Sequence, residues 1–486
     1  MAGRHPEQHV RCPDFPPEFT WINTRCPLRV KEDLRGRVVI LDFWTYCCIN
    51  CAHILPVLKR VEARFEAAPF LVIGVHSAKF ISEKDPENIR RAVERQEVTH
   101  PVVVDSEHDI WESFGVRAWP TLVIVDAEGY VRETLSGETR EEPLAARVRE
   151  LLDEGRVKGV LAASPLDVAP DPRDRSTFLR FPGRVLPAGS GLVVADSAHN
   201  RLVFADMEGS VRAVVGEGGA GARDGAAGHA SFHNPQGLAA IGETLYVADT
   251  GNHLLRAVSL RTLEVTTVAG TGELGQGSPP RGPQGARRVP LRSPWGLLAV
   301  GERLLVSMAG SHQIWLHDPG ESIAGAWAGS GVEDHVDGPL MQAAFAQPSG
   351  LAAAGRLILV ADSETSSVRA IDIGDSRVRT IAGRGLFDFG DVDGPADEAL
   401  FQHPLDVAAE TGRLFVADTY NNKIRAIAFG TMETSTLFGD GDPKILSEPG
   451  GIAVVDGRIF IADTSNHRIL EGDPASGELA VIEIGG

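Results

Sequence analysis

Residues 41–56 have the sequence Leu41-Asp-Phe-Trp-Thr-Tyr-Cys-Cys-Ile-Asn-Cys-Ala-His-Ile-Leu-Pro56. The apolar run from Val38 to Phe43 has the length of a buried strand, and the run from Ala52 to Phe65 places its apolar residues on one helical face. Three cysteines therefore lie at a turn from a strand to a helix. This turn decides the fold of the first part of the chain, and it is where we look for chemistry.

Two of these cysteines, Cys48 and Cys51, are spaced for redox chemistry. The start of a helix offers unpaired backbone N–H groups and a partial positive charge, which favour a thiolate over a thiol. We therefore predict that Cys48 is the nucleophile. Cys51 lies one helical turn further on and can close a disulfide with Cys48, so the pair can cycle between dithiol and disulfide.

The turn resembles the active site of thioredoxin-like proteins at several further positions. Asp42 stands where that family keeps a buried carboxylate behind the second cysteine, and Pro56 stands where its active-site helix is kinked. Pro120 is similar to the cis-proline opposite the thiols, and Trp119 before it would offer backbone hydrogen bonds to an extended substrate. The resemblance implies a catalytic site made of Cys48, Cys51, Asp42 and Pro120, with Trp119 in substrate binding.

Other interpretations of the same residues exist. A Cys-x-x-Cys turn is often half of a zinc site, and Cys47 and His53 lie nearby. The chain has no second cysteine pair and the turn lacks the usual ligand spacing, so we expect no metal and no other cofactor. Asp42 as a polar strand end and Pro120 as an ordinary trans proline are each plausible alone, but their joint occurrence with the cysteines favours the thioredoxin-like site. Cys47, at a position that is usually tryptophan, leaves the redox potential and the substrate open.

The chain has 486 residues, which is too long for one ordinary core. Residues 1–154 alternate strand-like and helix-like runs, which predicts a layered α/β thioredoxin-like domain. Residues 155–176 are predicted to be a linker. Residues 177–486 contain short strands between Gly, Pro, Asp and Asn turns, which is typical of an all-β domain.

The second domain repeats one unit six times. Each unit centres on a strand that ends in Val-Ala-Asp or a variant of it, and a proline lies fourteen residues earlier. The prolines are Pro182, Pro235, Pro294, Pro348, Pro404 and Pro449, and the strands end at Asp196, Asp249, Met308, Asp362, Asp418 and Asp463. Six small antiparallel sheets around an axis bury every face, so the repeat predicts a six-bladed β-propeller. We expect residues 177–181 to meet residues 479–484 where the ring closes.

The unit resembles the NHL repeat through Pro-x-Gly-Leu followed by Val-Ala-Asp-Thr, Asn and Ile-Arg, as in Tyr420-Asn-Asn-Lys-Ile-Arg425. With the Cys-Cys-Ile-Asn-Cys turn before it, the whole chain resembles the NHL-repeat-containing protein 2 family. We interpret the repeated aspartates as structural, each bonding its own turn. Three units also carry Asp-Gly, at Asp224, Asp337 and Asp393, followed by a phenylalanine that we expect to pack where the chain crosses between blades.

Charge and composition limit the partners. The net charge is −19, and most of it lies after residue 177, which argues against nucleic acid or an anionic membrane as the main partner. The sequence has neither a signal-peptide core nor a run of membrane-spanning length, so we expect a soluble, cytoplasmic protein. Cys12 and Cys26 are more consistent with structural thiols than with catalytic ones.

These observations predict a cytosolic thiol-disulfide oxidoreductase whose propeller face binds protein or peptide clients. A cellular dithiol would serve as its reductant. The first alternative is a noncatalytic interaction scaffold or redox sensor, because the propeller makes up most of the chain. A weaker alternative is a metal-dependent hydrolase or lyase carried by the propeller.

Overall fold

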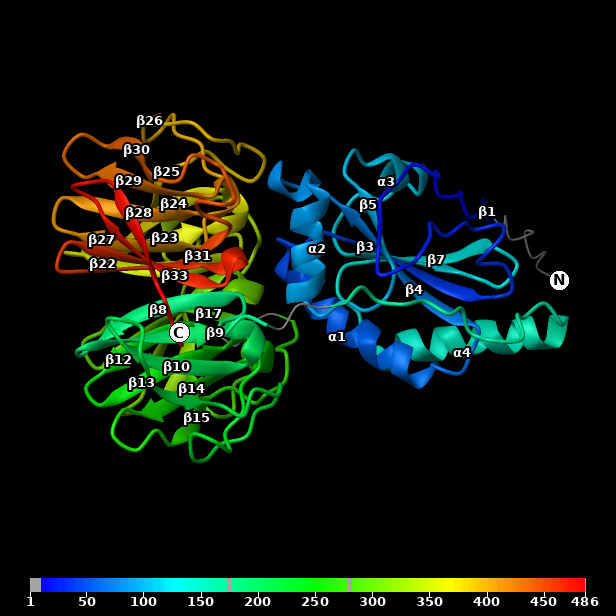
Figure 1. Ribbon diagram of the computed structural model, residues 1–486, viewed down its shortest axis with the longest axis horizontal. Helices are drawn as coiled ribbons and strands as arrows, with labels where there is room; N and C mark the ends of the chain where they lie inside the picture. Colours follow the sequence, from blue (N-terminus) through cyan, green and yellow to red (C-terminus); the bar gives the residue numbers. More distant parts are fainter. Residues whose placement is uncertain (1–9, 173–175, 278–281, 486) are drawn as a thin grey trace. The chain divides into compact units, whose positions relative to one another are not determined.

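The computed structural model describes residues 10–172, 176–277 and 282–485. The chain folds into two compact units, Met1–Asp174 and Arg175–Gly486 (Figure 1). The first is the expected thioredoxin-like α/β domain, and the second is the expected six-bladed propeller. Among the described residues, no helix combines the length and the apolar character needed to cross a membrane.

A seven-stranded sheet forms the centre of the first unit, in the order β1-β7-β6-β3-β4-β5-β2 (Figure 1). Its strands are β1 (Val10–Arg11), β2 (Trp21–Ile22), β3 (Val38–Trp44), β4 (Phe70–Ser77), β5 (Val102–Asp105), β6 (Thr121–Val125) and β7 (Tyr130–Ser136). β3 pairs in parallel with β4 and antiparallel with β6. Every residue of β3 is buried, as its continuous apolar run predicted.

The helices are α1 (Ile49–Arg64), α2 (Pro86–Arg95), α3 (Asp109–Ser113) and α4 (Glu141–Lys158), with a 3₁₀ turn at Ser82–Lys84. α1 and α4 lie side by side and pack on the sheet face that carries Val38 and Ile40 (Figure 1). Leu41 and Phe43 face the opposite side. Because side chains alternate along a strand, Asp42 and Trp44 lie on the α1 face of β3.

The segment that was predicted as a linker packs largely within the first unit. α4 continues through residue 154 to Lys158. Leu161 then joins the core beneath α4, Leu166 and Val168 pack on the opposite core, and Ala162 N–H donates to Gly36 O at 2.8 Å. These apolar side chains explain why the first unit extends beyond residue 154. Residues 173–175 of the predicted linker lie outside the described residues.

The second unit consists of six antiparallel sheets (Figure 1). Blades one to three contain β8 (Pro182–Ala188), β9 (Gly191–Asp196), β10 (Arg201–Asp206) and β11 (Val211–Val215); β12 (Pro235–Ile241), β13 (Thr244–Asp249), β14 (Leu254–Ser259) and β15 (Val265–Ala269); and β16 (Gln284–Gly285), β17 (Pro294–Val300), β18 (Arg303–Met308), β19 (Gln313–Asp318) and β20 (Ile323–Ala328).

Blades four to six contain β21 (Gly338–Pro339), β22 (Pro348–Ala354), β23 (Leu357–Asp362), β24 (Ser367–Asp372) and β25 (Arg377–Ala382); β26 (Gly394–Pro395), β27 (Asp406–Glu410), β28 (Arg413–Asp418), β29 (Lys423–Ala428) and β30 (Glu433–Phe438); and β31 (Pro449–Val455), β32 (Arg458–Asp463), β33 (Arg468–Asp473) and β34 (Glu478–Ile482). Each blade uses strands that are consecutive in the chain. The ring therefore closes through contacts between blades and not through a shared strand.

One hydrogen bond repeats around the whole ring. A hydroxyl near the end of each blade's second strand donates to a backbone carbonyl at the start of the next blade's first strand; the donors are Ser197, Thr250, Ser307, Ser363, Thr419 and Thr464. The last of them closes the ring, because Thr464 Oγ1 in blade six donates to Pro182 O in blade one at 2.8 Å. Leu179, Ile482 and Ile484 share one apolar cluster at this junction, which confirms the predicted seam.

A second set of bonds joins the blades through residues with a left-handed backbone, namely Asn200, His253, His312, Ser366, Asn422 and His467. Each side chain accepts a backbone N–H from the following blade. His467 Nδ1, for example, accepts from Phe181 N–H across the seam at 3.0 Å. The turn histidines His253, His312 and His467 therefore hold neighbouring blades together.

The strand-end aspartates bond more than their own turns, so our interpretation of them was incomplete. Asp249 Oδ1 accepts from His233 N–H at 2.7 Å, and its Oδ2 accepts from the buried Arg256 at 2.8 Å. Arg256 also bonds Asp224 of the Asp-Gly motif at 2.8 Å, and its guanidinium lies over the Phe232 ring. The same set recurs as Asp362, Arg369, Asp337 and Phe345, and as Asp418, Arg425, Asp393 and Phe401.

The first strands of the blades contact one another in sequence and surround the axis. The residue two places after the repeat proline is glycine in four blades, at Gly237, Gly296, Gly350 and Gly451. It is Arg184 in blade one and Asp406 in blade five, and these two form an ion pair. Asp406 is fully buried and also accepts from Ile452 N–H at 2.7 Å. A side chain at Gly350 would collide with Asp406 and one at Gly451 with Arg184, so these two glycines leave room for the charged pair.

Candidate active site

The structure brings Cys48 and Cys51 together at the start of α1. Cys48 is the N-cap residue and is half-buried, whereas Cys51 is buried at 1% exposure. Both are free thiols, like the other three cysteines. Burial raises the pKa of Cys51 well above its usual value, and a hydrogen bond with Cys48 raises it further. Solvent can therefore reach Cys48, while Cys51 needs a base to become a thiolate.

Asp42 lies beneath α1 with 1% of its surface exposed. Burial raises the pKa of its carboxyl to about 7; nearby Glu62 adds to this rise and His100 opposes it. The charge of Asp42 also acts on Cys51 and raises the pKa of that thiol. The structure thus places a carboxylate that changes protonation near neutral pH next to the cysteine that needs a base.

The raised pKa of Asp42 predicts how the free energy of unfolding depends on pH. Its value of about 7 in the folded chain lies above the ordinary 3.8, so the folded state binds the proton more tightly than the unfolded state. The stabilisation is complete below the ordinary value and is lost as the pH rises through about 7. Asp42→Asn has no carboxyl that titrates, so its free energy of unfolding should not fall with pH in this way. We expect the effect of the substitution on the free energy of unfolding, variant minus parent, to be more favourable at pH 8 than at pH 4 by about 3 kcal/mol. Urea denaturation at the two pH values measures the difference, and equal effects at both would contradict the assignment.

Pro120 and Trp119 lie in the loop before β6. The peptide bond between them is cis, as expected for this position. The Trp119 indole N–H donates to Ser77 O at 3.0 Å, and its ring packs against Trp111 with 4.5 Å between the ring centroids. The Trp119 side chain therefore anchors the loop to the end of β4 and to α3. The role of Trp119 in substrate binding stays a prediction.

Glu83 is a buried residue at the site that sequence reasoning missed. Its carboxylate accepts backbone N–H bonds from Cys47 at 2.9 Å, Lys79 at 2.8 Å and Phe80 at 2.9 Å. It has 0% exposure, and burial raises its pKa. Glu83 thus ties the cysteine turn to the segment after β4. No motif in the sequence marks it, because it lies far from the turn along the chain.

The residues considered for a metal site have other neighbours. Cys47 is buried with its Sγ 3.8 Å from Thr45 Oγ1. His53 Nδ1 lies 2.6 Å from Glu138 Oε1. Within the described ranges, no three His, Cys, Asp or Glu side chains are grouped so that they could hold a metal ion.

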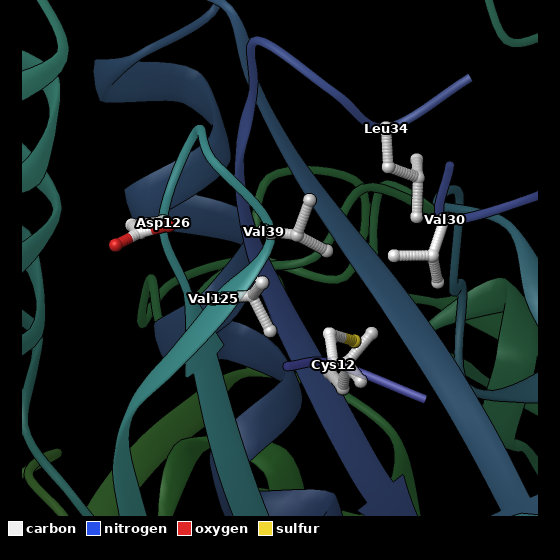
Figure 2. Close-up of a pocket in the computed structure, with 8 residues that line it drawn as sticks. Cys12, Val30, Leu34, Val39, Val125 and Asp126 are labelled. Carbon is white, nitrogen blue, oxygen red and sulfur yellow. The ribbon is translucent and has the colours of Figure 1, made fainter. Parts of the chain in front are cut away.

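The two remaining cysteines lie away from the turn. Cys12 lines a mainly apolar pocket with Val30, Val39 and Val125 on the face of the sheet opposite α1 (Figure 2). Burial raises the pKa of Cys12 to about 12, and Asp14 adds to the rise. Cys26 is exposed. The raised pKa disfavours the thiolate of Cys12, in agreement with a structural thiol.

Comparisons with known proteins agree with the fold of each unit. A family model described as thioredoxin-like matches residues 36–131, and a family model of the NHL repeat matches residues 446–471. The second match covers most of blade six. The thioredoxin-like match contains the cysteine turn, Asp42 and the loop with Pro120.

The relatives that are similar to the chain include the following three proteins. Protein SUPPRESSOR OF QUENCHING 1, chloroplastic, from Arabidopsis thaliana is 40% identical over 448 residues, which are 88% of this chain and 42% of that protein. NHL repeat-containing protein 2 from Homo sapiens is 38% identical over 474 residues, 89% of this chain and 64% of that protein. Thiol-disulfide oxidoreductase YkuV from Bacillus subtilis is 24% identical over 143 residues, 29% of this chain and 94% of that protein.

The chain thus spans 42% and 64% of the length of the first two relatives. The similarity runs through both units, since it covers 88% and 89% of this chain. These findings confirm the resemblance to the NHL-repeat-containing protein 2 family.

Proposed function

Because the chain is a thioredoxin-like protein with NHL repeats, we propose that it is a thiol-disulfide oxidoreductase whose propeller binds protein clients. One observation carries the proposal. A half-buried thiol, Cys48, stands at the start of α1 beside a buried thiol, Cys51, and a buried carboxylate, Asp42, lies behind them. This set supplies a nucleophile, a resolving thiol and a base in one place.

The proposed reaction has two steps. The Cys48 thiolate attacks a client disulfide, forming a mixed disulfide and releasing one client thiol. Asp42 then takes the proton of Cys51, and the Cys51 thiolate attacks Cys48 Sγ. The Cys48–Cys51 disulfide forms, the second client sulfur leaves, and two electrons have passed to the client. A cellular dithiol restores the reduced pair, while Pro120 and Trp119 hold the client chain.

The propeller is proposed to recruit the client through its surface. Its buried Asp and Arg residues and its turn histidines are engaged in bonds within and between blades, so they support structure and not a hydrolase or lyase site. The acidic charge of the chain favours a protein over a nucleic acid or an anionic membrane. We retain the cytoplasm as the proposed location; the word chloroplastic in a relative's name describes the Arabidopsis protein.

Cys51→Ser tests the proposal by interrupting the second step. The variant should accumulate mixed disulfides between Cys48 and its clients, and dithiothreitol should release them. The double variant Cys48→Ser/Cys51→Ser is the matched control and should trap nothing. If the single variant also traps nothing while both variants retain the same noncovalent partners, the scaffold function is supported and the oxidoreductase is rejected.

A further inference from the structure

A group of buried polar atoms lies behind the cysteine pair, beneath α1. Asp42, Trp44 and His100 are all at least nine-tenths buried. Within the described part of the chain, both carboxylate oxygens of Asp42, Nε1 of Trp44 and Nε2 of His100 have no hydrogen-bond partner. Each such group costs about 1–3 kcal/mol when it is left unsatisfied in a protein interior. Their occurrence together therefore calls for a shared explanation.

These atoms meet beside Gly74. Asp42 on β3 is the register partner of Gly74 on the parallel strand β4. A Cβ placed on Gly74 would lie 2.9 Å from Trp44 Nε1 and 3.5 Å from His100 Nε2. Trp44 Nε1 and His100 Nε2 thus both approach the backbone of Gly74, with Val102 Cγ2 3.1 Å from the same point, and Asp42 lies at the adjoining position of β3. Two to four polar partners are what a buried water molecule requires.

His100 connects this group of polar atoms to the surface. Its Nδ1 lies 3.3 Å from Glu62 Oε2. The His100 side chain is 4% exposed, whereas the Glu62 side chain, near the C-terminal end of α1, is 26% exposed. The titratable groups that act on Asp42 are Cys51 and Glu62 from α1 and His100 from the segment before β5. His100 and Glu62 thus lead from the buried carboxylate to solvent.

We propose that His100, together with Glu62, relays protons between Asp42 and solvent through a water molecule beside Gly74. The inference rests on the proposed function, and His100 acts through Asp42 without touching the client. After Asp42 has taken the proton of Cys51, it passes that proton to the water molecule. The water gives a proton to Nε2 of His100, Nδ1 releases one to Glu62, and Glu62 loses it to solvent. The relay returns Asp42 to its basic form.

The reaction of the full chain with Ellman's reagent separates the two thiol steps. All variants carry Cys26→Ser, which removes the exposed thiol. Attack by Cys48 releases the first thionitrobenzoate, and attack by Cys51 on the Cys48 adduct releases the second. His100→Gln should slow the second phase about tenfold or more near pH 7 and leave the first unchanged, since acid–base assistance is typically worth about 10²–10⁴ in rate. Gly74→Ala removes no titratable group, but its Cβ would lie 2.9 Å from Trp44 Nε1 and 3.5 Å from His100 Nε2. It would therefore displace a water molecule bound between them, and it should slow the second phase in the same way.

Two further variants make the result decisive. Glu62→Gln changes a partly exposed residue and should slow the second phase less than His100→Gln does. His53→Gln is the matched control, because it removes another buried His–Glu pair, which has no part in the relay; it should leave the ratio of the two phases unchanged. An unchanged second phase in His100→Gln and Glu62→Gln, or equal slowing of both phases, overturns the relay. Absence of the second phase in the parent chain would instead reject the proposed function.

Discussion

Cys48→Ser is expected to reduce catalysed disulfide exchange to the uncatalysed background, whereas Cys26→Ser should leave the rate unchanged. Cys48 is the half-buried residue at the start of α1, and Cys51 has only 1% exposure, so a client disulfide can reach only the first of them. Without the Cys48 thiolate, neither step of the exchange can begin. Reduction of a disulfide-bonded model client such as insulin, with dithiothreitol as the reductant, measures the rate.

Cys26→Ser is a suitable control because Cys26 is an exposed thiol outside the cysteine turn. Activity that survives in Cys48→Ser would show that another cysteine is the nucleophile. Activity that disappears in Cys26→Ser would place the reaction outside the site described above. Either result would remove the assignment of Cys48.

The second large effect concerns the stability of the propeller. Arg184→Ala leaves the fully buried Asp406 without its ionic partner. Removing one partner of a buried ion pair typically costs about 3–5 kcal/mol, because an uncompensated charge stays in the interior. The double variant Arg184→Gly/Asp406→Gly introduces the residue that the other four blades use at this position. We expect it to recover most of the loss.

Urea denaturation of the full chain, with hydrogen-exchange mass spectrometry to assign the transition to residues 182–482, measures this loss. Arg303→Ala is the matched control, since Arg303 forms a 2.7 Å pair with Asp318 while its own side chain is 58% exposed. An exposed pair of this kind contributes about 0–1 kcal/mol. If Arg184→Ala destabilises the propeller no more than Arg303→Ala does, the axial pair has no special role in closing the ring.

The sequence predicted the parts of the candidate site that belong to one local pattern. The buried strand before the cysteines, the position of Asp42 and the cis bond before Pro120 all appear in the structure. The helix begins at Ile49 and not at the predicted Ala52, because Cys48 O already accepts a helical hydrogen bond from Ala52 N–H at 3.1 Å. Helix boundaries depend on such local hydrogen bonds more than on apolar spacing.

Glu83 and His100 were not predictable in the same way. Each is an ordinary polar residue in its own segment and becomes part of the site only when β4 and β5 align beside β3. Periodicity describes which face of an element is apolar, and it carries no information on which distant polar groups meet. A search for polar residues close to apolar strands would have included both, together with many residues that have no such role.

The propeller could be predicted from the sequence because the repeated residues lie opposite each other on paired strands. In most blades the proline and the strand-end residue are register partners, as for Pro182 with Asp196 and Pro449 with Asp463. The fourteen-residue interval is therefore the length of one hairpin, and insertions fall elsewhere. The pairing of Arg184 with Asp406 also has a signal in the sequence, since these two residues are the only departures from glycine at one position of the six repeats.

Cys48 and Cys51 must form a reversible redox pair for the proposed reaction to occur, and a redox titration with mass-spectrometric mapping of the thiols tests this most directly. The full chain is equilibrated in buffers of graded potential, acid-quenched, alkylated and digested. We predict one two-electron transition, about 30 mV per tenfold change in the ratio of oxidised to reduced protein. Cys48 and Cys51 should be joined in the oxidised form, while Cys12, Cys26 and Cys47 should remain thiols. A chain that forms no disulfide across the series, or one that joins a different pair, would contradict the account.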